Sequence, residues 1–178
     1  MASELRVDRI VPVDGVPNNG GGGVVQVVQA STNTQLIVNT TTWTDTTLSA
    51  TITPKFSTSK ILMITNHSVF GVSTGTNDNL FWGIRCLRDA TVIFDPQANT
   101  TGPYEFGTNL NTLTGARYWY DRCIPPELLD SPNTTSAVTY KTQCRSYDPV
   151  NAAGDIRFQY NGGSIDGLSY ITLMEISA

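Results

Sequence analysis

Residues 138–145 alternate between two kinds of side chain, and this pattern constrains the fold more than any other feature of the chain. One series is largely apolar and the other is polar: Val138, Tyr140, Thr142 and Cys144 against Thr139, Lys141, Gln143 and Arg145. Successive side chains of a β-strand point to opposite faces of its sheet. The alternation therefore predicts an antiparallel strand with one buried side and one solvent-facing side.

Similar short runs, separated by residues that favour turns, continue along most of the chain. They predict about nine or ten strands, with a long polar stretch over 95–114 and at most a single turn over 127–130. The composition agrees, because 25 of the 178 residues are Thr, which suits pleated sheets, while there are only three Lys and four Glu to build helices. We expect an all-β protein whose residues 24–178 form an antiparallel β-sandwich of the jelly-roll kind, and a helical bundle is excluded.

The first 19 residues form a separate unit in this reading. They carry interleaved apolar side chains but also Pro12 and turn residues, which prevent a long central strand. The apolar members are Leu5, Val7, Ile10, Val11 and Val13. Four glycines at 20–23 follow, and such a run acts as a hinge because glycine loses the most freedom when it is ordered. We expect residues 1–19 to be a short extended arm that docks on another protein.

Charge and hydropathy exclude several classes of partner. The net charge is −4 and the 11 basic residues are scattered, so a nucleic-acid-binding patch is not expected. No stretch approaches the roughly 20 apolar residues that a membrane helix needs, so we expect no membrane insertion. The polar start of the chain lacks an apolar signal-peptide core, which indicates synthesis in a cytoplasm.

The chain offers little material for catalysis. Its single histidine, His67, lies in an apolar run and is expected to be a strand residue hydrogen-bonded to a neighbour rather than a catalytic base. Its three cysteines, Cys86, Cys123 and Cys144, show no metal-binding spacing and are expected to be buried thiols. No calcium-loop spacing appears either. We therefore expect no enzyme activity, no metal and no cofactor.

Three segments carry a resemblance to a known family. The first is Leu5 to Gly15 (LRVDRIVPVDG) with the glycine run and the start of the first strand after it. The second is Thr51-Ile52-Thr53-Pro54 followed by Ser57 to Leu62 (STSKIL). The third comprises Leu129 to Pro132 (LDSP), Thr139-Tyr140-Lys141 and the last eight residues, 171–178. In order and spacing they resemble the virion fibre proteins of tailed phages, tail fibres or related appendage proteins common in cyanophages.

The resemblance implies a homotrimeric tail fibre, assembled in the host cytoplasm and located in the virion. Residues 1–19 would anchor it to other virion proteins, and the sandwich would point outward to attach to the host surface. The close alternatives are a capsid-bound head fibre or decoration protein, and an adaptor that holds another virion protein. A depolymerase is a further alternative, but it usually has a longer β-helical body.

Two strands are apolar on both sides, which in an antiparallel sandwich calls for a second partner surface. We assign the expected oligomer interface to Ile171, Leu173, Leu62 and Ile64. Contacts to a host glycan or receptor are expected from aromatic and polar residues in or near the long polar stretch. These residues are Tyr104, Phe106, Asn109, Tyr118 and Tyr120. For Trp82 and Trp119, filling the core of the sandwich is the simpler interpretation.

Overall fold

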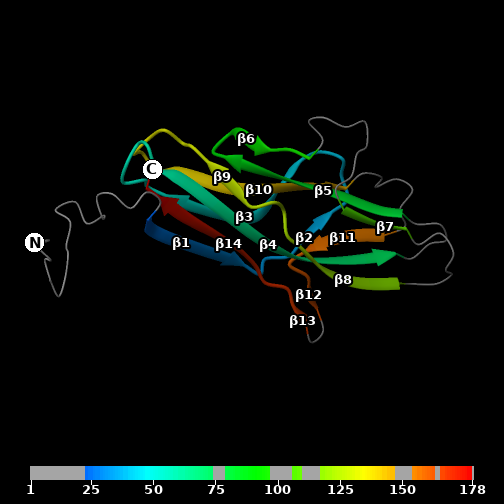
Figure 1. Ribbon diagram of the computed structural model, residues 1–178. Coiled ribbons are helices and arrows are strands. Elements are labelled where there is room, and N and C mark those ends of the chain that lie inside the picture. The colour runs from blue at the N-terminus through cyan, green and yellow to red at the C-terminus, as the bar shows by residue number, and fades with distance from the viewer. Residues whose placement is uncertain are drawn as a thin grey trace, which may run out of the picture.

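A computed structural model describes residues 23–73, 79–96, 106–109, 117–146, 154–162 and 165–177 of the chain. Within these ranges every regular element is a β-strand (Figure 1). The strands are β1 (Val24–Thr32), β2 (Leu36–Val38), β3 (Thr44–Ile52), β4 (Lys60–Ser73), β5 (Asn79–Arg88), β6 (Thr91–Phe94), β7 (Phe106–Asn109), β8 (Arg117–Cys123), β9 (Leu128–Asp130), β10 (Val138–Ser146), β11 (Gly154–Phe158), β12 (Asn161–Gly162), β13 (Ile165–Asp166) and β14 (Ser169–Ile176).

Two antiparallel sheets pack face to face, as a β-sandwich requires. The larger has the order β1-β14-β4-β11-β2, with β8 and β9 also paired to β4. The smaller has the order β3-β10-β5-β6, with β7 also paired to β5. Strands β12 and β13 form a separate small hairpin. The expectation of an antiparallel β-sandwich is confirmed.

Strand β4 is the central strand of the larger sheet. It is 14 residues long, and its two halves have different neighbours. The first half pairs with β14 on one side and β9 on the other, and the second half pairs with β11 and β8. Its inward side chains, such as Ile61, Met63 and Val69, are buried in the core between the sheets, which explains the apolar run in the sequence.

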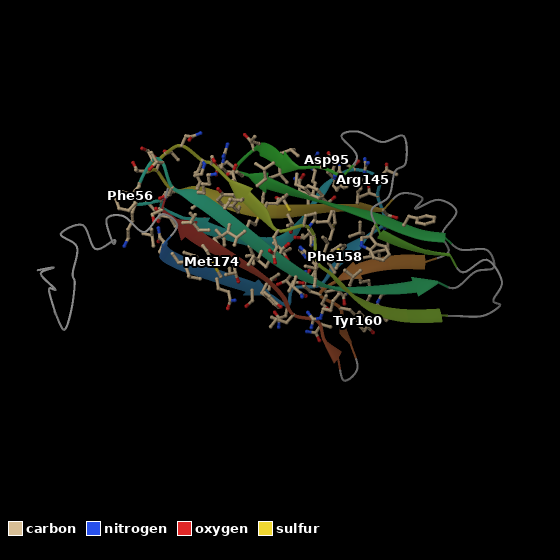
Figure 2. All side chains as sticks on the ribbon, viewed as in Figure 1. Phe56, Asp95, Arg145, Phe158, Tyr160 and Met174 are labelled. Atoms are coloured by element: carbon tan, nitrogen blue, oxygen red, sulfur yellow. The ribbon has the colours of Figure 1, made fainter. Side chains whose placement is uncertain are left out.

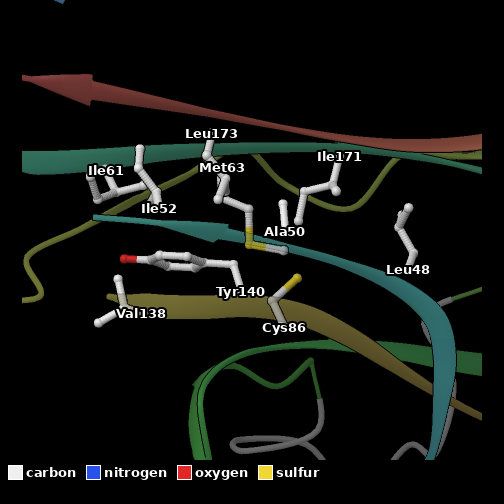
Figure 3. Close-up of a cluster of buried hydrophobic side chains, with 10 residues drawn as sticks. All are labelled: Leu48, Ala50, Ile52, Ile61, Met63, Cys86, Val138, Tyr140, Ile171 and Leu173. Atoms are coloured by element: carbon white, nitrogen blue, oxygen red, sulfur yellow. The ribbon is translucent and has the colours of Figure 1, made fainter. Parts of the chain in front are cut away.

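The core lies between the sheets and is built from the inward series of alternating residues. One cluster, drawn in Figure 3, joins β14 and β4 of the larger sheet to β3, β5 and β10 of the smaller one. Its members are Leu48, Ala50, Ile52, Ile61, Met63, Cys86, Val138, Tyr140, Ile171 and Leu173. A second cluster includes Trp82, Ile84, Cys123, Cys144 and Phe158. Residues 138–146 alternate between buried and partly exposed along β10, as the sequence predicts.

Three local expectations need correction. Residues 128–130 form strand β9 and not a turn, because they pair with Ile61 to Met63 of β4. Strand β7 lies within the predicted polar stretch and pairs with the start of β5. Residues 40–45 and 48–53 look like two separate runs in the sequence, but strand β3 is continuous from Thr44 to Ile52. A bulge opposite Lys141 and Gln143 absorbs extra residues, and Thr47 adopts a φ of 65° there.

Different parts of the chain lie at the two ends of the sandwich. At one end, the amide of Ser177 donates to the carbonyl of Gly23, so the first and last described residues lie together. At the other end, Ser73 closes β4 and pairs with the first residues of both β8 and β11. Strand β5 begins at this end, and β10 finishes there with Ser146 opposite Trp82. Figure 1 shows this separation along the length of the molecule.

Candidate functional site: two outer sheet faces

The outer face of the larger sheet carries an apolar row across four strands. Val27 on β1 pairs with Met174 on β14, Met174 with Leu62 on β4, and Leu62 with Leu129 on β9. The two inner members are partly covered by their neighbours, but Val27 is 54% and Leu129 55% exposed. A row of four directly opposed apolar side chains on an open face is unusual, because antiparallel sheets normally turn polar residues to water.

The adjacent rows extend this apolar surface. Val24 pairs with Ile176 on one side of the row, and Thr172 pairs with Ile64 on the other. Tyr170 lies further along the same face of β14 and is also exposed. We call Val24, Val27, Leu62, Ile64, Leu129, Tyr170, Met174 and Ile176 the apolar face. Four of the eight exposed large apolar side chains in the described ranges belong to it.

The outer face of the smaller sheet has a different chemistry, centred on Trp43. The indole packs over Gly83, where an added Cβ would lie 3.2 Å from its Cη2 atom. The guanidinium carbons of Arg85 and Arg145 lie 4.7 Å and 4.5 Å from the Trp43 ring centroid. Both are cation–π contacts. We call Trp43, Arg85, Gln143 and Arg145 the Trp43 cluster.

A hydrogen-bonded network borders this cluster. The Oε1 atom of Gln143 accepts two hydrogen bonds from Arg85, at 2.8 Å and 2.6 Å. Its Nε2 atom donates to Asp45 at 2.8 Å, and Lys141 pairs with the same carboxylate at 2.9 Å. Burial alone raises the pKa of Asp45, but Lys141, Gln143 and Arg85 outweigh burial and lower it. Asp45 is therefore ionised and already engaged.

A buried carboxylate organises the end of the sandwich where Gly23 lies. Glu175 is fully buried on the inward side of β14. It accepts hydrogen bonds from the backbone amides of Lys55 and Phe56, at 2.8 Å and 3.3 Å, and from the side chain of Gln26. Burial raises the pKa of Glu175, but the hydrogen bonds from Gln26 and the two amides outweigh burial and lower it. The carboxylate thus ties β14, β1 and the β3–β4 turn together.

His67 does not have the surroundings of a catalytic base. Its ring is fully buried and packs edge-on against Phe158, with the centroids 5.6 Å apart. Burial lowers its pKa to about 4. The expectation of a buried strand residue is confirmed, but the expected hydrogen bond is not, because neither ring nitrogen has a partner among the described residues.

Comparisons with known proteins return no match, neither to a family model nor to a curated protein. Within the described part of the chain, no helix is long and apolar enough to cross a membrane. In the same part, no group of three or more His, Cys, Asp or Glu side chains is placed to hold a metal ion.

The predicted interface residues separate in the structure. Leu62 and Ile64 lie on the apolar face, but Ile171 and Leu173 are fully buried in the core, so these two are removed from the expected interface. The last strand is apolar on both sides in the sequence, so its pattern does not tell which side faces inward. In the structure the inward side carries Ile171, Leu173 and also Glu175, whose carboxylate is satisfied by hydrogen-bond donors distant in sequence.

The other predicted contact residues are only partly placed. The arm residues Leu5, Val7, Ile10, Val11 and Val13 lie outside the described residues, as does Tyr104. The backbones of Phe106 and Asn109 belong to β7 in the smaller sheet, whereas those of Tyr118 and Tyr120 belong to β8 in the larger sheet. These two pairs therefore extend different sheets.

Trp43 is not among the contact residues predicted from the sequence, although strand alternation places Gln143 and Arg145 on a solvent-facing side. Trp43 and Gly83 are 40 residues apart along the chain and meet because β3 and β5 both pair with β10. No local pattern signals this contact.

Proposed function

We propose that this chain is a non-enzymatic structural protein of a phage virion, a homotrimeric tail fibre anchored through residues 1–19. The observation that carries the proposal is the apolar face, with its row from Val27 to Leu129 across four strands. In a monomer such a row would remain exposed to water, where an antiparallel sheet normally carries polar side chains. In a protein that assembles with copies of itself, the row can be buried in the interface.

The size of the apolar face supports an interface. Three strands about 4.8 Å apart, with eight residues that rise about 3.3 Å each, and the three residues of β9 beside them span roughly 400 Å² of sheet. The largest apolar patch on a typical monomer is about 300–600 Å² and is often a functional surface. The occupant we propose is the same face of two other copies, so that three apolar faces meet around a threefold axis. The number three comes from the family resemblance.

The two ends of the sandwich support the orientation of such a fibre. Residues 1–22 join the described chain at Gly23, next to Ser177, so an anchoring arm leaves from that end. The opposite end contains Ser73, Arg117 and Gly154, where three strands of the larger sheet meet. That end would face the host surface if the arm is held by the virion.

The oligomeric state tests the interface. Light scattering after gel filtration should give a trimer for the natural chain and a monomer for Met174→Glu, because a carboxylate in the centre of the row would be buried without a partner. Ser49→Glu, an exposed change on the other sheet, is the matched control and should remain trimeric. A monomeric natural chain would overturn the oligomer, and a trimeric Met174→Glu would overturn this face as its interface.

The location and the arm need separate tests. In a cryo-EM map of intact virions we expect threefold density on the tail, and density on the capsid would instead favour a head fibre or decoration protein. Deleting residues 1–19 should abolish incorporation and leave the trimer intact. If the deletion instead exposes the apolar face to a hydrophobic dye, the chain's own arm covers that face. Another virion protein bound at the outward end would favour the adaptor.

A further inference from the structure

Arg145 stands apart from the other basic residues of its sheet. Lys141 is paired with Asp45, and Arg85 is held by Gln143, with the carboxylate of Asp95 3.9 Å away. Among the described residues Arg145 has no carboxylate or hydrogen-bond partner, and the carbon of its guanidinium lies 4.5 Å from the centroid of the Trp43 ring. A positive charge held against an aromatic ring, with its donors unused, is prepared to receive an anion.

The surroundings of Arg145 hold its guanidinium against the Trp43 ring and away from the carboxylates of this face. Trp43 is itself held over Gly83, where there is no side chain to displace it. Gln143 ties up both Arg85 and Asp45, so the nearest carboxylate on this face is already bonded to Gln143 and Lys141. Three cations and two carboxylates thus gather on this face, and Arg145 is the cation without a partner in the described part of the chain. Among the described residues of this face the charge is therefore positive in sum, although the whole chain carries −4.

From this geometry we infer that the Trp43 cluster is a binding site for an acidic polysaccharide, with Arg145 pairing its carboxylate or sulfate groups. An arginine fork binds such groups through two parallel hydrogen bonds. The inference rests on the proposed function, since it assigns a ligand class to the attachment role.

The position of the cluster favours a polysaccharide over a virion protein. Arg145 pairs with Gly83 one residue before β10 ends, at the end of the sandwich away from Gly23. Figure 2 shows Arg145 and Asp95 on the side of the smaller sheet and Met174 on the side of the larger one. The cluster therefore stays open when copies associate through the apolar face, and it lies at the end of the sandwich opposite Gly23.

The test is direct binding of the full chain to defined polymers. Binding is measured by the change in Trp fluorescence and by surface plasmon resonance. The probes are alginate, which carries carboxylates, and dextran sulfate, with unsubstituted dextran and polyglutamate as comparisons. We expect at least one acidic polysaccharide to bind, with an affinity that falls as salt is added. Dextran and polyglutamate should bind much more weakly.

Variants locate the site. Arg145→Gln should lower the affinity by about ten- to a hundredfold, the usual effect of losing hydrogen bonds to a charged group. Arg145→Lys should fall in between, because it keeps the charge and loses the fork. Lys55→Gln, exposed at the opposite end, removes the same charge and should bind as the natural chain does. All three variants should keep the natural thermal midpoint and oligomeric state.

The outcomes separate this inference from the proposed function. Equal losses of affinity in Arg145→Gln and Lys55→Gln would mean that the polymer is attracted by net charge only, and they would overturn the site. Binding to polyglutamate as tight as to alginate would replace the polysaccharide by an acidic peptide. Failure of every acidic probe, with trimer and tail location intact, would overturn this inference alone. A monomer without virion location that still binds alginate through Arg145 would overturn the proposed function alone.

Discussion

Truncating Glu175 to alanine should loosen the end of the sandwich from which the arm leaves. The change removes the acceptor of three hydrogen bonds, two from the amides of Lys55 and Phe56 and one from Gln26. These donors are partly buried, so each lost bond lowers the free energy of unfolding by about 1 kcal/mol. The sum of about 2–3 kcal/mol corresponds to a fall in Tm of about 5–10 °C for a domain of this size.

Thermal and urea unfolding, followed by circular dichroism, measure this effect. Glu127→Ala is the matched control, because Glu127 is exposed and its removal changes the net charge by the same amount. Exposed substitutions of this kind change stability by about 0.5 kcal/mol or less. If Glu175→Ala unfolds at the same temperature as Glu127→Ala, the carboxylate does not anchor the β3–β4 turn and the reasoning is wrong.

The pH dependence of the difference gives a second test. The pKa of Glu175 is lowered in the folded chain, so its contribution to stability is fully present above its ordinary pKa of 4.5. It is then lost as the pH falls through the folded pKa, because protonation removes the charged acceptor. The gap in unfolding free energy between the natural chain and Glu175→Ala should therefore be constant from pH 7 to about pH 5 and shrink below pH 4.5.

Three further predictions concern stability. Because burial lowers the pKa of His67 from 6.5 to about 4, the unfolded chain binds the extra proton between these values. The free energy of unfolding should fall by about 3 kcal/mol from pH 6.5 to pH 4. In urea titrations at several pH values, His67→Met should remove this pH dependence. An unchanged pH dependence would mean that another group causes it. Tyr140→Phe removes a 2.7 Å hydrogen bond to Asp130, so urea unfolding should show a loss of about 1–2 kcal/mol, whereas no loss would mean that Arg88 alone holds Asp130. Thr47→Gly relieves a φ of 65° and should leave the Tm unchanged or raise it, while Ser49→Gly in the same strand costs about 1 kcal/mol; equal losses would contradict strain at Thr47.

Much of the secondary structure followed from short-range patterns. Residues 138–146 alternate in the structure as they do in the sequence, and Cys86, Cys123 and Cys144 are buried free thiols. Strands such as β7 and β9 escaped prediction because they are short and their pairing partners lie elsewhere in the chain. A strand of three or four residues has no period to recognise, and only the edge that it covers makes it a strand.

The sequence by itself determined the all-β fold class, because the alternation of side chains is a local property of a strand and does not depend on which strands it pairs with. The tertiary structure decided which side is buried in strands that are apolar on both sides, such as β14, and which residues meet. Glu175 can lie inside because the amides of Lys55 and Phe56 and the side chain of Gln26, 149 residues away along the chain, bond to it. The row from Val27 to Leu129 and the contact of Trp43 with Arg145 arise in the same way. Both surfaces depend on the pairing of distant strands, and a pattern with a period of two identifies neither the partner strand nor a shift of register by two residues.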